Sequence, residues 1–242
     1  MSGHSKWANI KHKKEKTDAQ KAKVFTKIGK EISIAVKEGG GDPNSNAKLR
    51  DLIQKAKSNN VPNDNIERTI KKALGAGGES YEEIVYEGYG PGGVAVIVET
   101  TTDNRNRTAG NVRSYFSKYH GNMGQTGSVS FMFEDKGVIV IANEDGDIDE
   151  DKLMETALEA GAEDIGLEED TFEVLTPVND LYAVKDALEG AGYKILSTEE
   201  AKIPSSYINL SDEEAVIKMN KLIDALDDNE DVQNYWHNWE NE

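Results

Sequence analysis

The chain has 242 residues, of which 37% are hydrophobic, and a formal net charge of −17 at pH 7. This length exceeds what one small core needs and predicts two or three domains. The absence of cysteine excludes disulfides, thiolate metal sites and cysteine nucleophiles, and it favours a reducing, cytoplasmic location. Apolar runs such as Val94 to Val98 are far shorter than a bilayer span, so neither membrane insertion nor secretion is expected.

The charge is distributed very unevenly along the chain. Residues 1–78 hold 17 Lys+Arg and 8 Asp+Glu, whereas residues 79–242 hold 11 and 37. An asymmetry of this size is typical of an arm or module that binds a polyanion. The alternative is that the basic segment is a solvated tail. We therefore predict a basic N-terminal module on an acidic body, with nucleic acid as the partner.

Helical periodicity predicts three helices in the basic segment. Asp18 begins a helix that runs to about Lys37, and its apolar residues recur at helical spacing. Glycines at 39–41 end this helix, a second helix follows, and Pro62 lies in the first turn of a third. Apolar residues on one side of each helix predict a compact bundle.

Lysines of the first helix lie on one side of a helical wheel, at Lys23, Lys27, Lys30 and Lys37. Lys23, Lys27 and Lys30, called the lysine stripe below, fall roughly opposite Phe25 and Ile28. One face of the helix is therefore expected to pack and the other to be cationic. The lysine stripe is a candidate nucleic-acid contact.

The first 14 residues interleave an aromatic ring and imidazoles with cations. The candidate nucleic-acid contacts here are Lys6, Trp7, Lys11, His12, Lys13 and Lys14. Lysines neutralise phosphates, and Trp7 offers a face on which a base can stack. The alternative for Trp7 is a structural role, in which it anchors the arm on the helical module.

The pattern becomes strand-like from Tyr81. Strands are expected at 83–86, 94–100 and 128–133, with a helix at 104–120 between the second and third. The segment 88–93 matches G-x-G-x-x-G, but a strand follows it instead of a helix, so we interpret it as a hairpin turn.

A polar loop leads into the helix at 104–120. Free backbone N–H groups at a helix start, together with Arg105 and Arg107, have the chemistry to hold an anion. The alternative is that both arginines balance the charge of the acidic body. Arg105 and Arg107 complete the set of candidate nucleic-acid contacts.

The middle of the chain contains an internal repeat. Residues 157–165 resemble residues 187–195, and each is a helix end that turns into a strand. With strands at 137–142 and 172–175, this gives βαββαβ, the ferredoxin-like arrangement, over about 134–203. A helix and a strand in 204–242 supply what 79–133 lacks.

The predicted fold class is α+β. We expect a basic helical domain at 1–78, a split α+β domain at 79–133 plus 204–242, and an inserted ferredoxin-like domain at 134–203. The last two are expected to be ferredoxin-like α/β sandwiches, one inserted in the other.

Neither catalytic residues nor a metal site are predicted. The acidic run 143–151 does not fit an EF-hand, because the register set by Gly146 puts apolar Ile141 at the first ligand position. The histidines are dispersed, and neither a nucleophile elbow nor a Walker A sequence is present. We expect a protein that is not an enzyme, with no cofactor and no small-molecule substrate.

Four segments closely resemble the YebC family: residues 1–13, 87–93, 101–107 and 121–129. The resemblance implies a three-domain protein without catalytic residues. Members of the family are commonly described as DNA-binding transcriptional regulators, and mitochondrial and some bacterial relatives are described as translation factors that act at the ribosome.

Our first functional hypothesis is therefore a DNA-binding regulator of transcription. The alternative is a ribosome-associated translation factor that contacts ribosomal or transfer RNA, and a third possibility is a protein-interaction scaffold that uses the acidic domains. The turn between the second and third helices is expected to be longer than in a helix-turn-helix motif, which weakens the case for major-groove binding.

Overall fold

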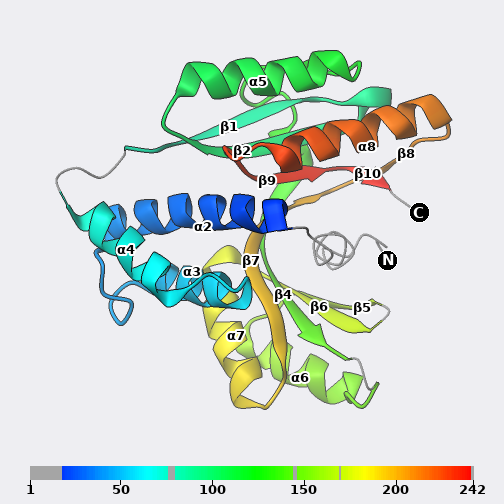
Figure 1. The fold of residues 1–242 in the computed structure, drawn as a ribbon. Helices are drawn as coiled ribbons and strands as arrows, with labels where there is room; N and C mark the ends of the chain where they lie inside the picture. Colours follow the sequence, from blue (N-terminus) through cyan, green and yellow to red (C-terminus); the bar gives the residue numbers. More distant parts are fainter. Residues whose placement is uncertain (1–17, 76–79, 144–145, 169, 241–242) are drawn as a thin grey trace. The chain divides into compact units, whose positions relative to one another are not determined.

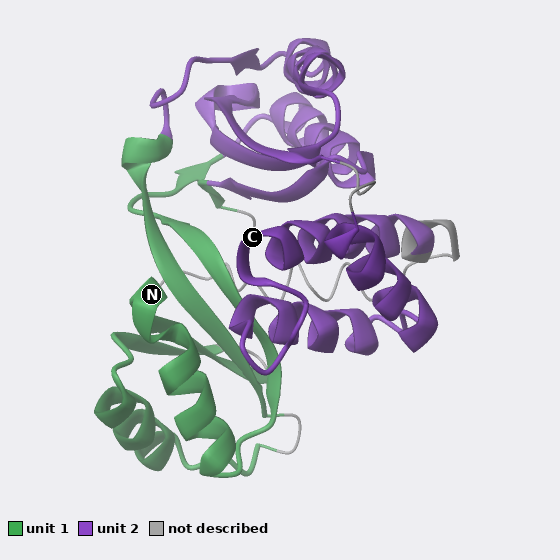
Figure 2. Ribbon diagram, turned by 90° about the vertical axis from the view of Figure 1, so that its left-hand side faces the viewer, with its two compact units in different colours: residues 1–15, 130–209, 238–242 green, residues 16–129, 210–237 purple. Residues whose placement is uncertain are grey.

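The computed structural model describes residues 18–75, 80–143, 146–168 and 170–240. These residues form two compact units, and each unit is described here by itself (Figure 2). One unit holds residues 130–209 and the chain from residue 238. The other holds the described residues up to 129 together with 210–237, so it is built from two separate stretches of sequence.

Three helices form the N-terminal module, which confirms this part of the predicted fold: α2 (Asp18–Gly39), α3 (Ala47–Ser58) and α4 (Asn63–Leu74) (Figure 1). The module has a hydrophobic core of its own, because every buried member of this cluster comes from these helices. The members are Ile28, Ile32, Ala35, Val36, Leu49, Leu52, Ala56, Ile66 and Ala73. Removing this apolar surface from water stabilises the bundle.

Side-chain caps and short turns connect the helices. Asn46 caps α3, since its side-chain oxygen accepts the N–H of Leu49 at 3.0 Å, and its amide donates to the carbonyl of Ala35 in α2. Four residues, 59–62, join α3 to α4, and left-handed Asn60 (φ 59°) reverses the chain within them. The expectation of a turn too long for a helix-turn-helix motif is therefore wrong.

The split domain contains a four-stranded antiparallel sheet in the order β3-β1-β2-β9. Its elements are β1 (Glu82–Tyr89), β2 (Ala95–Thr102), α5 (Arg105–Lys118), β3 (Asn122–Met123), α8 (Glu213–Asp228) and β9 (Val232–His237). The last two follow the insertion, and β9 pairs with β2 from Val96↔His237 to Thr100↔Val232. The C-terminal segment thus completes the sheet that the first segment begins.

Both helices of the split domain cover the same face of this sheet. An added Cβ at Gly88 would meet Phe116 of α5 at 2.9 Å, and one at Gly90 would meet Met219 of α8 at 3.0 Å. Gly90 directly follows β1 and is extended, and residues two apart in an extended segment point to the same side. The turn Pro91–Gly93 follows directly, with Gly92 at φ 69°, so the glycine-rich motif forms a tight turn beside α8.

The strand expected at 128–133 is wrong. Residues Ser130–Met132 form a 3₁₀ turn, and the short strand β3 lies earlier in the chain. The cause is Glu87, which is buried in β1 and accepts the N–H groups of Gly127 and Val129 at 2.8 and 2.9 Å. Because a side chain holds these backbone groups, they are not available for a strand ladder.

The inserted domain has the ferredoxin-like strand order β5-β6-β4-β7. Its elements are β4 (Phe133–Ala142), α6 (Glu150–Ala160), β5 (Asp164–Glu168), β6 (Thr171–Thr176), α7 (Leu181–Gly190) and β7 (Ile195–Pro204). Neighbouring strands are antiparallel. Ile139 and Ile141 of β4 pack against Leu153 of α6 and Leu188 of α7, so both helices cover one face of the sheet.

The unit boundaries differ from the expected domain boundaries. Residues 130–133 and 204–209 belong to the inserted unit, and β8 (Ile208–Asn209) pairs in parallel with β10 (Trp239–Glu240) in that same unit. The helical module shares a unit with the split domain. Among the described helices, none combines the length and the apolar character that crossing a bilayer would require. Nor do three metal-ligating side chains gather anywhere in these ranges.

The contribution of α8 to the split domain is testable. Leu222 is fully buried, so Leu222→Ala is expected to lower the free energy of unfolding by about 2–5 kcal/mol. Ile217 lies on the exposed side of the same helix, and Ile217→Ala is the control, with an expected change of about 0.5 kcal/mol or less. Urea unfolding followed by circular dichroism measures both. Equal effects of the two substitutions would contradict the packing of α8 onto this sheet.

Candidate nucleic-acid interface

The candidate residues of the N-terminal arm lie outside the described part of the chain. These residues are Lys6, Trp7, Lys11, His12, Lys13 and Lys14. The remaining candidates, the lysine stripe and the two arginines, all lie in the unit that contains the helical module and the split domain.

The lysine stripe contacts the end of α8 and the turn that follows it, residues 227–231, called the acidic turn below. The Lys23 ammonium lies 2.8 Å from the carboxylate of Asp228, and the Lys27 ammonium donates to the backbone carbonyl of Asp227 at 2.9 Å. Carbonyl groups at the C-terminus of a helix carry partial negative charge and lack intrahelical partners. The lysines of α2 therefore bind the C-terminal end of α8.

Lys30 is the most enclosed residue of the stripe. It is 8% exposed, and its ammonium lies 2.6 Å from Asp231 Oδ1 while donating to the carbonyls of Glu230 and Thr101 at 3.0 and 3.3 Å. The cationic face that the helical wheel predicts is thus covered by acceptors of the split domain. A nucleic-acid contact by the lysine stripe stays a prediction.

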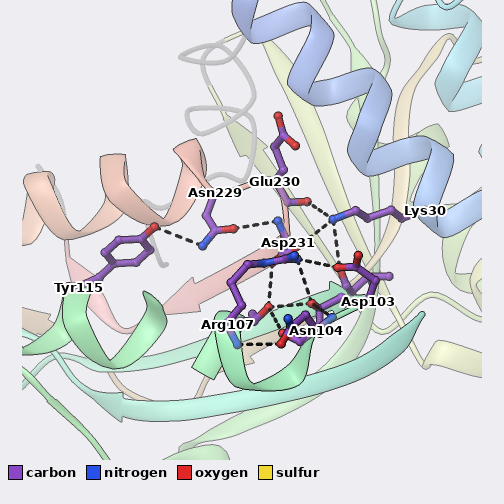
Figure 3. Close-up of polar contacts among 11 residues, drawn as sticks. Lys30, Asp103, Asn104, Arg107, Tyr115, Asn229, Glu230 and Asp231 are labelled. Atoms are coloured by element: carbon purple, nitrogen blue, oxygen red, sulfur yellow. Dashed lines mark hydrogen bonds and ion pairs between the residues drawn. The ribbon is translucent and has the colours of Figure 1, made fainter. Parts of the chain in front are cut away.

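Asp231 is the centre of a buried polar network (Figure 3). Its carboxylate is 2.6 Å from the Lys30 ammonium, 2.7 Å from the Arg107 guanidinium and 2.8 Å from the Thr108 hydroxyl, which donates to it. Burial acts to raise the pKa of Asp231, but the hydrogen bonds from Lys30, Arg107 and Thr108 outweigh it and lower that pKa. The network thus holds an ionised carboxylate between α2, α5 and the start of β9.

The two candidate arginines have different surroundings. The first turn of α5 is capped by Asn104, whose side chain accepts the N–H of Arg107 at 3.1 Å. The Arg107 guanidinium lies 2.7 Å from both Asp103 and Asp231, and hydrogen bonds to Asp231 and then Asp103 raise its pKa. Arg105 is exposed. At the start of α5, the Arg107 N–H thus already has an acceptor in Asn104, and the Arg107 guanidinium belongs to the Asp231 network.

The exposed cations of α3 and α4 were not among the residues predicted from sequence. Arg50, Gln54 and Lys57 form an exposed line along α3, and Arg68 and Lys71 are exposed on α4. Across the described ranges, neither Arg50 nor Lys57 takes part in an ion pair. The helical wheel used for the first helix would have found this line, because it lies on a different side of α3 from Leu49, Leu52 and Ala56.

The fold defines a protein with a three-helix module, a split α/β domain and an inserted ferredoxin-like domain. Residues 5–76 match the TACO1/YebC protein N-terminal domain, and residues 81–239 match the TACO1/YebC second and third domain. The chain belongs to the TACO1/YebC family. This membership confirms the resemblance to YebC proteins found in the sequence.

Relatives of similar length are closely similar to this chain. A probable transcriptional regulatory protein of Acetivibrio thermocellus is 58% identical over 240 residues, 99% of each chain. A second probable transcriptional regulatory protein, from Caldicellulosiruptor saccharolyticus, is 56% identical over 243 residues, 100% of each chain. The crystal structure of a conserved hypothetical protein from Aquifex aeolicus is 46% identical, covers 98% of this chain and 97% of its own, and superposes with a TM-score of 0.87.

The Asp231 network predicts a pH-dependent stability difference. Asp231→Asn leaves Lys30 and Arg107 without their shared anion, so we expect about 3–5 kcal/mol lower free energy of unfolding at neutral pH. The pKa of Asp231 is lowered on folding, so its stabilisation is present above the unfolded pKa and is lost as pH falls through the folded pKa. The difference between wild type and variant should therefore shrink below about pH 4.

Denaturant unfolding between neutral pH and about pH 3 measures this difference. Asp228→Asn is the matched control, because the Asp228 side chain is 70% exposed and its pair with Lys23 is expected to contribute about 1 kcal/mol or less. A constant gap between wild type and Asp231→Asn at all pH values would show that Asp231 acts by shape and not by charge.

Proposed function

We propose that this protein is a nucleic-acid-binding regulator of gene expression, and that it binds duplex DNA to regulate transcription. The observation that carries the proposal is the set of exposed cations on α3 and α4, Arg50 and Lys57 above all, on a helical bundle with its own core. Cationic side chains on a stable helical surface release counterions from phosphates when they bind.

The geometry of α3 and α4 favours duplex DNA as the ligand. A four-residue turn joins them, as in helix-turn-helix motifs, and the DNA major groove is wide enough for one α-helix. In that motif the first helix crosses the backbone and the second enters the groove, so Arg50 and Lys57 of α3 would contact phosphates and exposed Arg68 and Lys71 of α4 would reach the bases. Arginine and lysine pair well with guanine, so Arg68 and Lys71 have the chemistry for base contacts.

The names of similar proteins agree with this proposal. The relatives from Acetivibrio thermocellus and Caldicellulosiruptor saccharolyticus are both called probable transcriptional regulatory proteins. We further propose that the protein acts in the cytoplasm by binding alone, without catalysis, cofactor or small-molecule substrate. A translation factor that contacts ribosomal or transfer RNA would use the same cations, because phosphate contacts carry little sequence information.

The DNA-binding proposal predicts a change in salt dependence. The double variant Arg50→Glu/Lys57→Glu removes two phosphate contacts, so the slope of log affinity against log salt should fall in magnitude by about 1.8 for duplex DNA. Lys152→Glu/Lys194→Glu is the control, because both lysines are exposed in the inserted domain and the net charge changes equally. Fluorescence anisotropy with labelled DNA, at several salt concentrations, measures the slope.

Equal losses in both double variants would contradict the assignment of the interface to the helical module. A sucrose gradient of cell lysate, run at low and moderate salt, separates the two cellular targets. Transcriptional regulation predicts that the protein stays near the top of the gradient, whereas a translation factor would travel with ribosomes. Comigration with ribosomes at moderate salt would therefore replace DNA by ribosomal RNA as the ligand.

A further inference from the structure

The contact between the lysine stripe and the acidic turn places anionic oxygens where a nucleic acid would place its phosphates. Four of the five residues at 227–231 are acidic. Two of their carboxylates and two of their backbone carbonyls accept from the three lysines, at 2.6–3.0 Å. The turn therefore presents a row of negative oxygens along one face of α2.

The dimensions of the lysine stripe suit the phosphodiester backbone of a nucleic acid. Lys23 and Lys30 are seven residues apart in α2, which corresponds to about 10 Å at 1.5 Å per residue. Successive phosphates of one duplex strand advance by about 3.4 Å along the axis, so the stripe matches the axial length of about three phosphates.

The contact joins the helical module to the split domain, and these two parts do not share a hydrophobic core there. Every member of the helical module's buried cluster comes from α2, α3 and α4, and none comes from the split domain. The Lys23–Asp228 pair is partly exposed, at 33% and 70% of the two side chains, and such pairs are weak and screened by salt. Separation would return the charges of both sides to water, which offsets much of the lost attraction.

Asp231 keeps two partners when Lys30 is withdrawn. Arg107 and Thr108 both belong to the split domain, and they lie 2.7 and 2.8 Å from the Asp231 carboxylate. The buried anion is therefore not left unpaired if α2 moves away. Lys30 in turn would exchange one anionic oxygen for another if a phosphate took the place of the acidic turn.

From these contacts we propose that the acidic turn is an internal mimic of the nucleic-acid backbone. It covers the lysine stripe in the free protein, and the phosphates of a bound nucleic acid displace it from the stripe. The inference rests on the proposed function and adds a second contact region, whose availability the protein itself limits. Nucleic acid must therefore compete with the acidic turn for Lys23, Lys27 and Lys30.

A neutralised turn tests this competition. The triple variant Asp227→Asn/Asp228→Asn/Glu230→Gln keeps Asp231 and the backbone carbonyls, so the buried network remains in place. We expect it to bind labelled duplex DNA and, in a parallel series, labelled ribosomal RNA about three- to tenfold more tightly than wild type. The control Asp151→Asn/Glu155→Gln/Glu159→Gln removes three exposed charges from α6 and should show a smaller gain.

A chemical tether tests the opening directly. The chain has no cysteine, so Lys23→Cys/Asp228→Cys introduces the two thiols needed for a short bismaleimide linker. The linked protein should bind both probes more weakly than the same variant with each thiol blocked by N-ethylmaleimide. The two forms share the same substitutions, so their difference reports on opening and not on lost charge.

The outcomes separate the inference from the proposed function. Equal affinity of linked and blocked forms, with no gain in the neutralised turn beyond its α6 control, would overturn the inference while wild-type binding still supports the function. A selective gain in affinity for DNA or for RNA identifies which nucleic acid displaces the acidic turn. Failure of every form, wild type included, to bind either probe would overturn both.

Discussion

The buried carboxylate of Asp231 joins three segments that are far apart in the sequence. It accepts from Lys30 in α2 and from Arg107 and Thr108 in α5, and it stands at the start of β9. A buried anion is costly unless it is paired and hydrogen-bonded; Arg107 and Thr108 meet this need within the split domain, and Lys30 adds a third partner from α2. The Lys30 contact holds α2 against the split domain in the free protein, and it explains why the lysine stripe faces acceptors.

Much of the fold follows from local patterns. Helical periodicity located α2, α3, α4 and α5, and the internal repeat identified both halves of the ferredoxin-like domain. The strand expected at 128–133 failed, because alternation of apolar residues cannot reveal that Glu87, some 40 residues earlier, binds the backbone of Gly127 and Val129. The expected length of the turn between α3 and α4 was wrong, because a helical wheel does not show where helices end. Asn60 and Pro62 limit this turn to four residues.

The sequence predicted which side of α2 carries the candidate lysines, but not which residues those lysines contact. The wheel correctly placed Lys23, Lys27 and Lys30 on one side of α2. It contained no information about the acidic turn, whose residues lie about 200 positions further along the chain. Arg107 likewise finds Asp231 across 124 positions. Pairings of this kind depend on tertiary topology, whereas the exposed line through Arg50 and Lys57 depends on α3 alone.

The pairing of β9 with β2 sets an order for folding during synthesis. The inserted domain has its strands β4 to β7 contiguous in sequence, so all of them leave the ribosome before α8 and β9 do. Until then β2 has one unpaired edge, and α2 lacks the acidic turn that covers its lysines. At about 5–20 residues per second, the interval between β2 and β9 is on the order of ten seconds. For that time a nascent chain exposes its basic helices without their acidic cover, next to the RNA of the ribosome that makes it.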